Sequence, residues 1–201
     1  MVNARDQNFG DGNSDEFSTR NLLLLSVLSF VVYLSLSMAL FYVFHDKGID
    51  GAFGSDYSIT KQLFIGVGAG CLGAFLIRVI SSRSPVSEVL DDFYIYKIFK
   101  QVRLSSFNRA QLSVFAGTGE ELLFRGAIQP LLGVWLTSLI FVAIHGYFSF
   151  KSSGHVLFGI VMFGLSLMLG FLFEYIGLVA AMSAHAVYDM IMLSSITDNE
   201  K

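Results

Sequence analysis

The sequence is poor in charge, cysteine and proline, and each shortage excludes something. Charged residues make up 14% of the 201 positions and hydrophobic residues 54%, whereas soluble domains carry about 25% charge. The single cysteine, Cys71, excludes an internal disulfide and a metal site built from cysteines alone. The net charge of −3 argues against a nucleic-acid partner, which requires a concentrated basic face. Lipid is the solvent that fits this composition.

Long apolar runs predict membrane-spanning helices. Residues 21–44 contain no charge, and a bilayer core needs about 20 such residues in a helix. A second run over 62–80 carries Gly66 and Gly70, and this small-xxx-small spacing lets helices approach closely. Four more helices fit the rest of the chain, at about 108–129, 131–148, 155–173 and 176–194. Pro130 separates the first two of them.

These runs predict an all-α, polytopic transmembrane bundle of about six spans. Residues 1–20, rich in Gly, Asn and Asp, are expected to form a disordered cytoplasmic tail. Residues 21–106 hold two spans followed by an amphipathic segment, and residues 107–195 hold a four-helix core. Residues 81–109 interleave basic and apolar side chains, which predicts a partly helical segment at the cytoplasmic membrane surface between the second and third spans.

The basic segment also predicts the orientation. Because basic loops stay in the cytoplasm, both termini are expected there. We expect an integral protein of the bacterial inner (plasma) membrane, since the chain shows no eukaryotic targeting feature.

Within residues 110–195, four charged side chains stand inside the predicted membrane helices: Glu120, Glu121, Arg125 and Asp189. A charge at the bilayer centre costs about 2.5–3.5 kcal/mol or more, so these groups must face the bundle interior and satisfy one another. Glu121 and Arg125 are four residues apart, which favours an ion pair along one helix face. Glu120 is rotated from Glu121 by about 100°. It is therefore left available as a general base or acid.

Two histidines extend this set. His145 ends the sequence FVAIH, one turn after Phe141, and His185 lies four residues before Asp189 in HAVYD. The Asp189 carboxylate is placed to fix the tautomer of His185. Neighbouring antiparallel helices could bring Glu120, both histidines and Asp189 into one cavity below the cytoplasmic surface. Intramembrane ionisable groups are functional by default, although a purely structural role for the Glu121 ion pair stays equally open.

Three motifs occur in the order of a known family. EELLFR has the pattern EExxxR, FVAIH has FxxxH, and HAVYD has HxxxN/D. Together they resemble the CPBP family of CAAX proteases and bacteriocin-processing proteins, whose eukaryotic branch is the type II CAAX prenyl endopeptidase. The resemblance covers roughly residues 107–195. It implies that this four-helix core is the catalytic core of an α-helical intramembrane endopeptidase.

The resemblance also implies residue roles. Glu120 and His145 would activate a water, and His185 and Asp189 would stabilise the oxyanion. The other motif residues would support the site: Glu121, Arg125 and Phe141. An ionised Asp189 only accepts hydrogen bonds, so it would act protonated, through His185 or as a metal ligand. Glu120, His145, His185 and Asp189 offer N and O ligands for a divalent metal such as zinc, which this interpretation does not require.

Substrate and rival functions stay open at this point. The expected partners are the lipid bilayer and a peptide or protein substrate at the membrane, whether a prenylated CAAX protein, a bacteriocin leader or another peptide. One rival is a non-catalytic bacteriocin-immunity or scaffold protein that keeps the fold. A less favoured rival is a proton-coupled transporter, since chains of Asp, Glu and His also relay protons. Inverted repeats, common in transporters, are not visible in the sequence.

Overall fold

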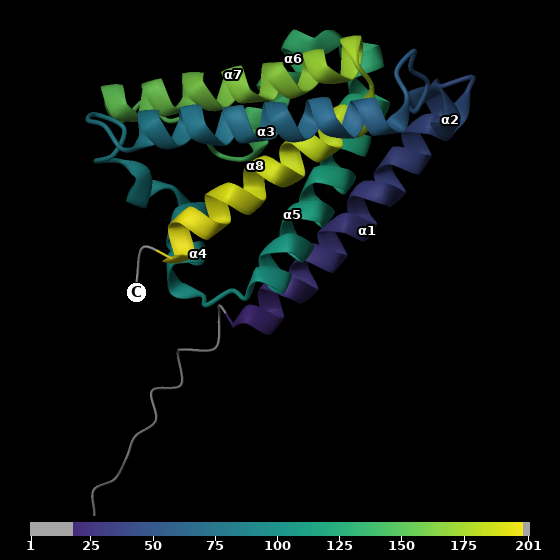
Figure 1. Ribbon diagram of the computed structural model, residues 1–201. Coiled ribbons are helices and arrows are strands. Elements are labelled where there is room, and N and C mark those ends of the chain that lie inside the picture. The colour runs from purple at the N-terminus through teal and green to yellow at the C-terminus, as the bar shows by residue number, and fades with distance from the viewer. Residues whose placement is uncertain (1–17, 199–201) are drawn as a thin grey trace, which may run out of the picture.

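The computed structural model describes residues 18–198, which contain helices and no strand, so the all-α prediction is confirmed. The tail expected over residues 1–20 lies almost wholly outside the described residues. Figure 1 shows the helices, whose bounds are α1 Thr19–Phe44, α2 Gly48–Ala52, α3 Ile59–Ser81, η1 Leu90–Asp92, α4 Tyr94–Gln101, α5 Ser106–Glu121, η2 Leu122–Ile128, α6 Gln129–Ile144, α7 Ser153–Tyr175 and α8 Leu178–Asp198.

Five helical stretches of the described chain are long and apolar enough to cross a membrane. They are α1, α3, the continuous run α5–η2–α6, α7 and most of α8. About six spans were predicted, and the difference lies in the run Ser106–Ile144, which has 39 residues. At 1.5 Å per residue this run is about 58 Å long, nearly twice a bilayer core of about 30 Å. It therefore does not cross once as a straight rod.

The run changes direction at Gly133, and the prediction that Pro130 separates two helices is wrong. Pro130 lies in the first turn of α6, where its missing N–H costs no hydrogen bond. Gly133 has φ 76° and ψ 165°, a conformation that residues with a Cβ rarely adopt. After Gly133 the chain returns along the bundle, so one continuous run supplies both of the helices expected here.

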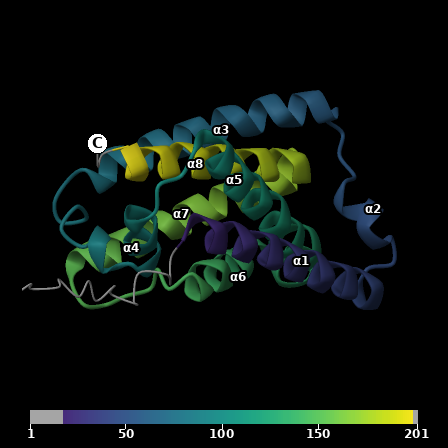
Figure 2. The ribbon, with the colours of Figure 1, turned by 90° about the horizontal axis from the view of Figure 1, so that it is seen from below.

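Helix α8 lies against α3 on one side and α5 on another (Figure 2). Gly66 and Gly70 of α3 make the first contact possible, because a Cβ on either glycine would clash with Ser183, Ala180 or Ala184 of α8. The close helix approach expected from their spacing is therefore present. Gly117 makes the second contact possible in the same way, since its Cβ would meet the α8 backbone at 2.7 Å.

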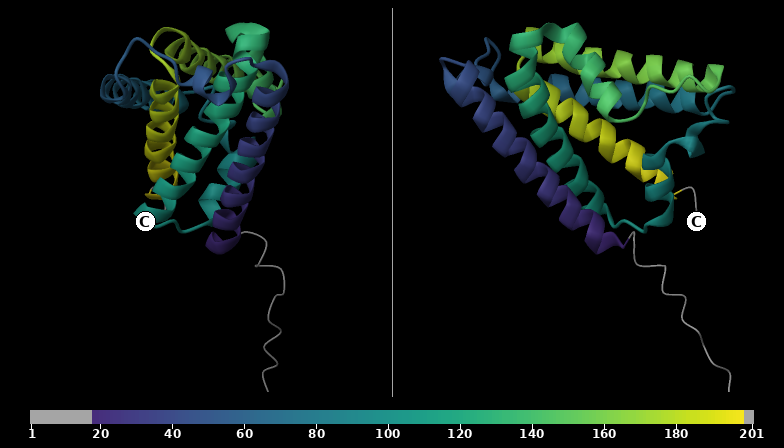
Figure 3. Two further views of the ribbon diagram at one scale, coloured as in Figure 1. Left: turned by 90° about the vertical axis from the view of Figure 1, so that its right-hand side faces the viewer. Right: turned by 180° about the vertical axis from the view of Figure 1, so that it is seen from behind.

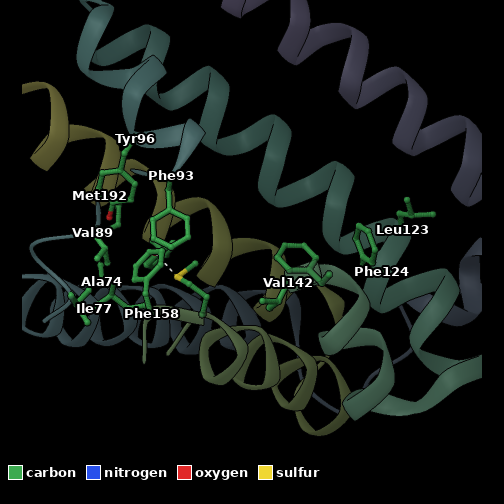
Figure 4. Packing of buried hydrophobic residues seen from close by; sticks show 14 residues of the cluster. Ala74, Ile77, Val89, Phe93, Tyr96, Leu123, Phe124, Val142, Phe158 and Met192 are labelled. Carbon is green, nitrogen blue, oxygen red and sulfur yellow. Dashed lines mark hydrogen bonds between the residues drawn. The ribbon is translucent and has the colours of Figure 1, made fainter. Parts of the chain in front are cut away.

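The segment between α3 and α5 is partly helical, as predicted, and it packs onto the end of the bundle. Val86, Phe93 and Tyr96 are buried in the main apolar cluster. The rings of Phe93 and Phe158 have centroids 4.7 Å apart, and Figure 4 shows them side by side. The segment thus closes one end of the helix bundle with apolar side chains.

The two described chain ends lie at the same end of the bundle as this segment (Figures 1 and 3). The Thr19 hydroxyl at the start of α1 donates to the Arg103 carbonyl at 3.1 Å. A common side for both ends agrees with the predicted topology. That this side is cytoplasmic remains a prediction.

Candidate active site

The EELLFR motif lies in the middle of the bundle. Every residue from 119 to 127 is buried, and α5 passes into π-helical geometry directly after Glu121, as η2. Such π segments inside helices are frequent at functional sites. Burial on all sides means that each polar group of the motif must find its partner within the protein.

Glu121 and Arg125 form the predicted ion pair, and both are fully buried, with 0% exposure. The Arg125 Nε donates to Oε2 of Glu121 at 3.0 Å. The guanidinium also donates to the hydroxyls of Ser138 at 3.2 Å and Ser166 at 2.8 Å, and it lies 5.4 Å from the Phe141 ring centroid. Through these charge-assisted hydrogen bonds the buried Arg125 connects η2 to α6 and α7.

Glu121, and not only Asp189, orients His185. Oε1 of Glu121 is 2.8 Å from Nδ1 of His185, and because an ionised carboxylate only accepts, Nδ1 carries the donated hydrogen. Nε2 of His185 lies 3.5 Å from Oδ2 of Asp189. The sequence suggested Asp189 as the group that fixes the tautomer, whereas the shorter contact belongs to Glu121.

Glu120 has different surroundings. It is buried, yet its Oε2 has no hydrogen-bond partner among the described residues, and its nearest charged neighbour is Nε2 of His145 at 3.5 Å. Nδ1 of His145 lies 2.6 Å from the Phe141 carbonyl, so Nδ1 donates there and Nε2 is directed at Glu120. Burial alone would lower the pKa of His145, but the hydrogen bond and charge of Glu120, with the Phe141 carbonyl, raise it above its ordinary value.

One cavity of about 270 Å³ is bordered by Glu120, His145, His185 and Asp189. The expected convergence of the motif residues is therefore present. Helices α1, α4, α5, α6, α7 and α8 form its walls, and most of the lining is apolar. The Phe141 ring, also at the cavity, stacks on His145 with centroids 4.3 Å apart. The arrangement places two carboxylates and two imidazoles around one small cavity with a mainly apolar lining.

The fit of these residues to a metal ion is poor in this arrangement. Residues 18–198 contain no group of three or more His, Cys, Asp or Glu side chains positioned to hold a metal ion. The four candidates instead form two contacts, Glu120 with His145 and His185 with Asp189. A zinc site requires at least three protein ligands around one point. The side chains themselves are therefore the proton acceptors and donors of the site.

Sequence reasoning missed several polar groups of the site. Ser138 and Ser166 complete the Arg125 contacts, and Tyr33 of α1 and Tyr147 border the cavity. Burial and the charges of Asp189 and Glu120 raise the pKa of Tyr147, so its hydroxyl is protonated at neutral pH. A serine or tyrosine inside a long apolar run was the available signal, because a hydroxyl at that depth needs a partner.

Comparison with known proteins matches the part of the chain that holds the three motifs. The profile of the family described as type II CAAX prenyl endopeptidase Rce1-like matches residues 104–191. The uncharacterized protein YpbD of Bacillus subtilis (strain 168) is 35% identical over 86 residues, which are 42% of this chain and 43% of that protein. The chain thus matches less than half the length of this curated relative. No solved structure matches the chain.

All three motifs lie inside the matched region, since Glu120 and Asp189 fall between its limits. The apolar helices of the bundle agree with an integral membrane protein. The resemblance to the type II CAAX prenyl endopeptidases is therefore confirmed, and residues 104–191 are the part of this chain that is similar to them.

Proposed function

We propose that this chain is an intramembrane endopeptidase of the CAAX-protease type, with Glu120 and His145 activating the attacking water. The carrying observation is the unpartnered Oε2 of Glu120, which faces Nε2 of His145 across 3.5 Å inside the cavity. Two hydrogen-bond acceptors at this separation can each accept one hydrogen of the same water. His145 is held ready for this role, because its Nδ1–H is committed to the Phe141 carbonyl.

The reaction then needs one proton to move twice. Glu120 removes a proton from the water as the water oxygen adds to the carbonyl carbon of the scissile peptide bond. His145 accepts the second hydrogen of the water and fixes its direction. When the tetrahedral intermediate collapses, the C–N bond breaks and Glu120 returns the proton to the leaving nitrogen. Atoms and charges balance with water as the only co-substrate.

His185 supplies the donor for the oxyanion. Its Nδ1–H is bound by Glu121, and its Nε2 borders the cavity next to Asp189. Flanked by two carboxylates, the ring carries both protons, and Nε2–H donates to the oxygen that becomes negative in the tetrahedral intermediate. In this arrangement Asp189 acts through His185 and does not itself donate.

The core over residues 107–195 would carry this chemistry, and a peptide or protein in the bilayer would be the substrate. The match to a CAAX prenyl endopeptidase family supports a peptide cut near a C-terminal Cys-aliphatic-aliphatic-X sequence. The active cavity would face the cytoplasm of a bacterial inner membrane, together with both chain ends.

Two internally quenched peptides test the proposal with protein reconstituted in liposomes. They share one sequence ending in Cys-aliphatic-aliphatic-X, and only one of them is farnesylated on the cysteine. Wild-type protein is expected to hydrolyse at least the farnesylated peptide, and Glu120→Gln and His145→Ala to lose about 100-fold or more of that rate. Hydrolysis by Glu120→Gln at the wild-type rate, or of neither peptide by the wild type, contradicts the proposal.

A further inference from the structure

Tyr33 of α1 has no place in the three motifs, yet it borders the same cavity as Glu120. It lies near the middle of α1, 14 residues after Thr19 and 11 before Phe44, which is roughly 21 Å and 17 Å along the axis. Tyrosines of membrane helices are usually found at the two interfaces, where water reaches the hydroxyl. A hydroxyl at this depth needs a partner within the protein.

The partner that we assign is the Glu120 carboxylate, because it borders the same cavity as the Tyr33 phenol. Packing between α1 and α5 places the two groups together. Gly119 lies directly before Glu120, and a Cβ there would meet the Phe30 ring at 2.9 Å and the Tyr33 ring at 3.4 Å. One turn earlier on α5, Phe115 stacks on Phe30 with centroids 4.9 Å apart. The glycine therefore lets α1 approach until the Tyr33 ring lies beside the part of α5 that carries Glu120.

A hydrogen bond from the Tyr33 phenol would orient the Glu120 carboxylate, which has fewer bonded partners than Glu121. Arg125 holds Glu121 in place, whereas Glu120 has the imidazole of His145 at 3.5 Å and an Oε2 without a hydrogen bond to the described residues. A carboxylate with free rotamers would not keep one oxygen aimed at His145. A donor on the other side of the carboxylate fixes its direction and leaves Oε2 available.

We propose that Tyr33 is a positioning residue of the active site, whose phenol O–H holds the Glu120 carboxylate toward His145. The proposal rests on the proposed catalytic role of Glu120. It also assigns a part in the chemistry to α1, which lies outside the matched region 104–191.

The test measures kcat and KM for the farnesylated quenched peptide in liposomes, with thermal unfolding recorded for each variant. Tyr33→Phe is expected to lower kcat about 10- to 100-fold, the effect of losing one hydrogen bond to a charged group, while KM and the fraction of folded protein at the assay temperature stay unchanged. Placing 4-aminophenylalanine at position 33 restores an N–H donor on the same ring. It is expected to recover most of the lost kcat.

Two control variants separate positioning from packing. Tyr42→Phe removes a hydroxyl from the same helix at a side chain that is 92% exposed, and it should leave both constants unchanged. Phe30→Leu removes the stacking on Phe115. It should lower the unfolding temperature clearly, while kcat per folded molecule changes less than in Tyr33→Phe.

The outcomes keep the two proposals apart. If Glu120→Gln is inactive but Tyr33→Phe keeps the wild-type kcat, or loses activity only in proportion to the folded protein, the role of Tyr33 is wrong and that of Glu120 stands. If Glu120→Gln hydrolyses the peptide as fast as wild type, both are wrong.

Discussion

Glu120 and Glu121 are neighbours in the sequence with opposite surroundings. Glu121 is bonded at both oxygens, to Arg125 and to His185, and is fully buried. Glu120 is 8% exposed, borders the cavity and keeps one oxygen without a hydrogen bond. A carboxylate whose bonds are all satisfied holds structure together, whereas one with an open acceptor beside an imidazole is available for proton transfer. A rotation of about 100° between adjacent residues thus separates the carboxylate that stabilises the fold from the one available for chemistry.

Removing the charge of Glu121 should have the largest effect on folding. Glu121→Gln leaves the Arg125 cation buried without a counter-charge, and breaking a buried pair costs about 3–5 kcal/mol. The free energy of unfolding in bilayers or mixed micelles measures this. The control is Lys100→Gln, which removes a partly exposed pair with Asp91 and should change the free energy by about 1 kcal/mol or less. Equal changes in the free energy of unfolding for the two variants would contradict the structural role of Glu121.

The two serines that complete the Arg125 contacts should have a smaller effect. Ser138→Ala and Ser166→Ala each leave one guanidinium N–H without its acceptor, at a cost of about 1–3 kcal/mol in the free energy of unfolding. Ser35→Ala is the matched control, because that exposed hydroxyl only returns to the Val31 carbonyl of its own helix. A loss at Ser35 as large as at Ser166 would argue that Arg125 does not depend on these hydroxyls.

The smallest expected effect is on the titration of His145. Glu120 raises the pKa of this imidazole, so Glu120→Gln should lower it, as ¹³C NMR of labelled histidines can measure. The pair stabilises the fold below the unfolded-state pKa of about 6.5, and this stabilisation is lost as pH rises through the higher folded-state pKa. The His45 signals, from a ring bonded to the Ala127 carbonyl, should not respond. An unchanged pKa of His145 would mean that the two side chains do not interact.

Much of this site could be predicted from the sequence, because charges in an apolar helix have few permitted arrangements. The spacing of Glu121 and Arg125 gave the ion pair, and the rotation of Glu120 away from them gave the free carboxylate. The positions of the motifs on separate helices predicted that His145 and His185 would border one cavity. Helical periodicity and the cost of burial suffice for each of these inferences.

The rest depended on contacts that periodicity does not report. The turn at Gly133 replaced the expected break at Pro130, because proline is tolerated in a first helix turn and glycine alone readily takes that φ. The second bond of Glu121, to His185, crosses between helices 64 residues apart in the chain. Tyr33 borders the cavity of Glu120, where Gly119 leaves room for α1 to approach, and no local pattern encodes that approach.

The central claim is that the two adjacent glutamates do separate work, and one paired measurement tests it most directly. Glu120→Gln and Glu121→Gln are made as matched isosteric variants, and each is assayed for its free energy of unfolding and for hydrolysis of the farnesylated peptide per folded molecule. We predict that Glu120→Gln folds as stably as the wild type and has lost about 100-fold or more of the rate, whereas Glu121→Gln is destabilised by about 3–5 kcal/mol. A Glu120→Gln protein that is stable and still hydrolyses at the wild-type rate would contradict the account.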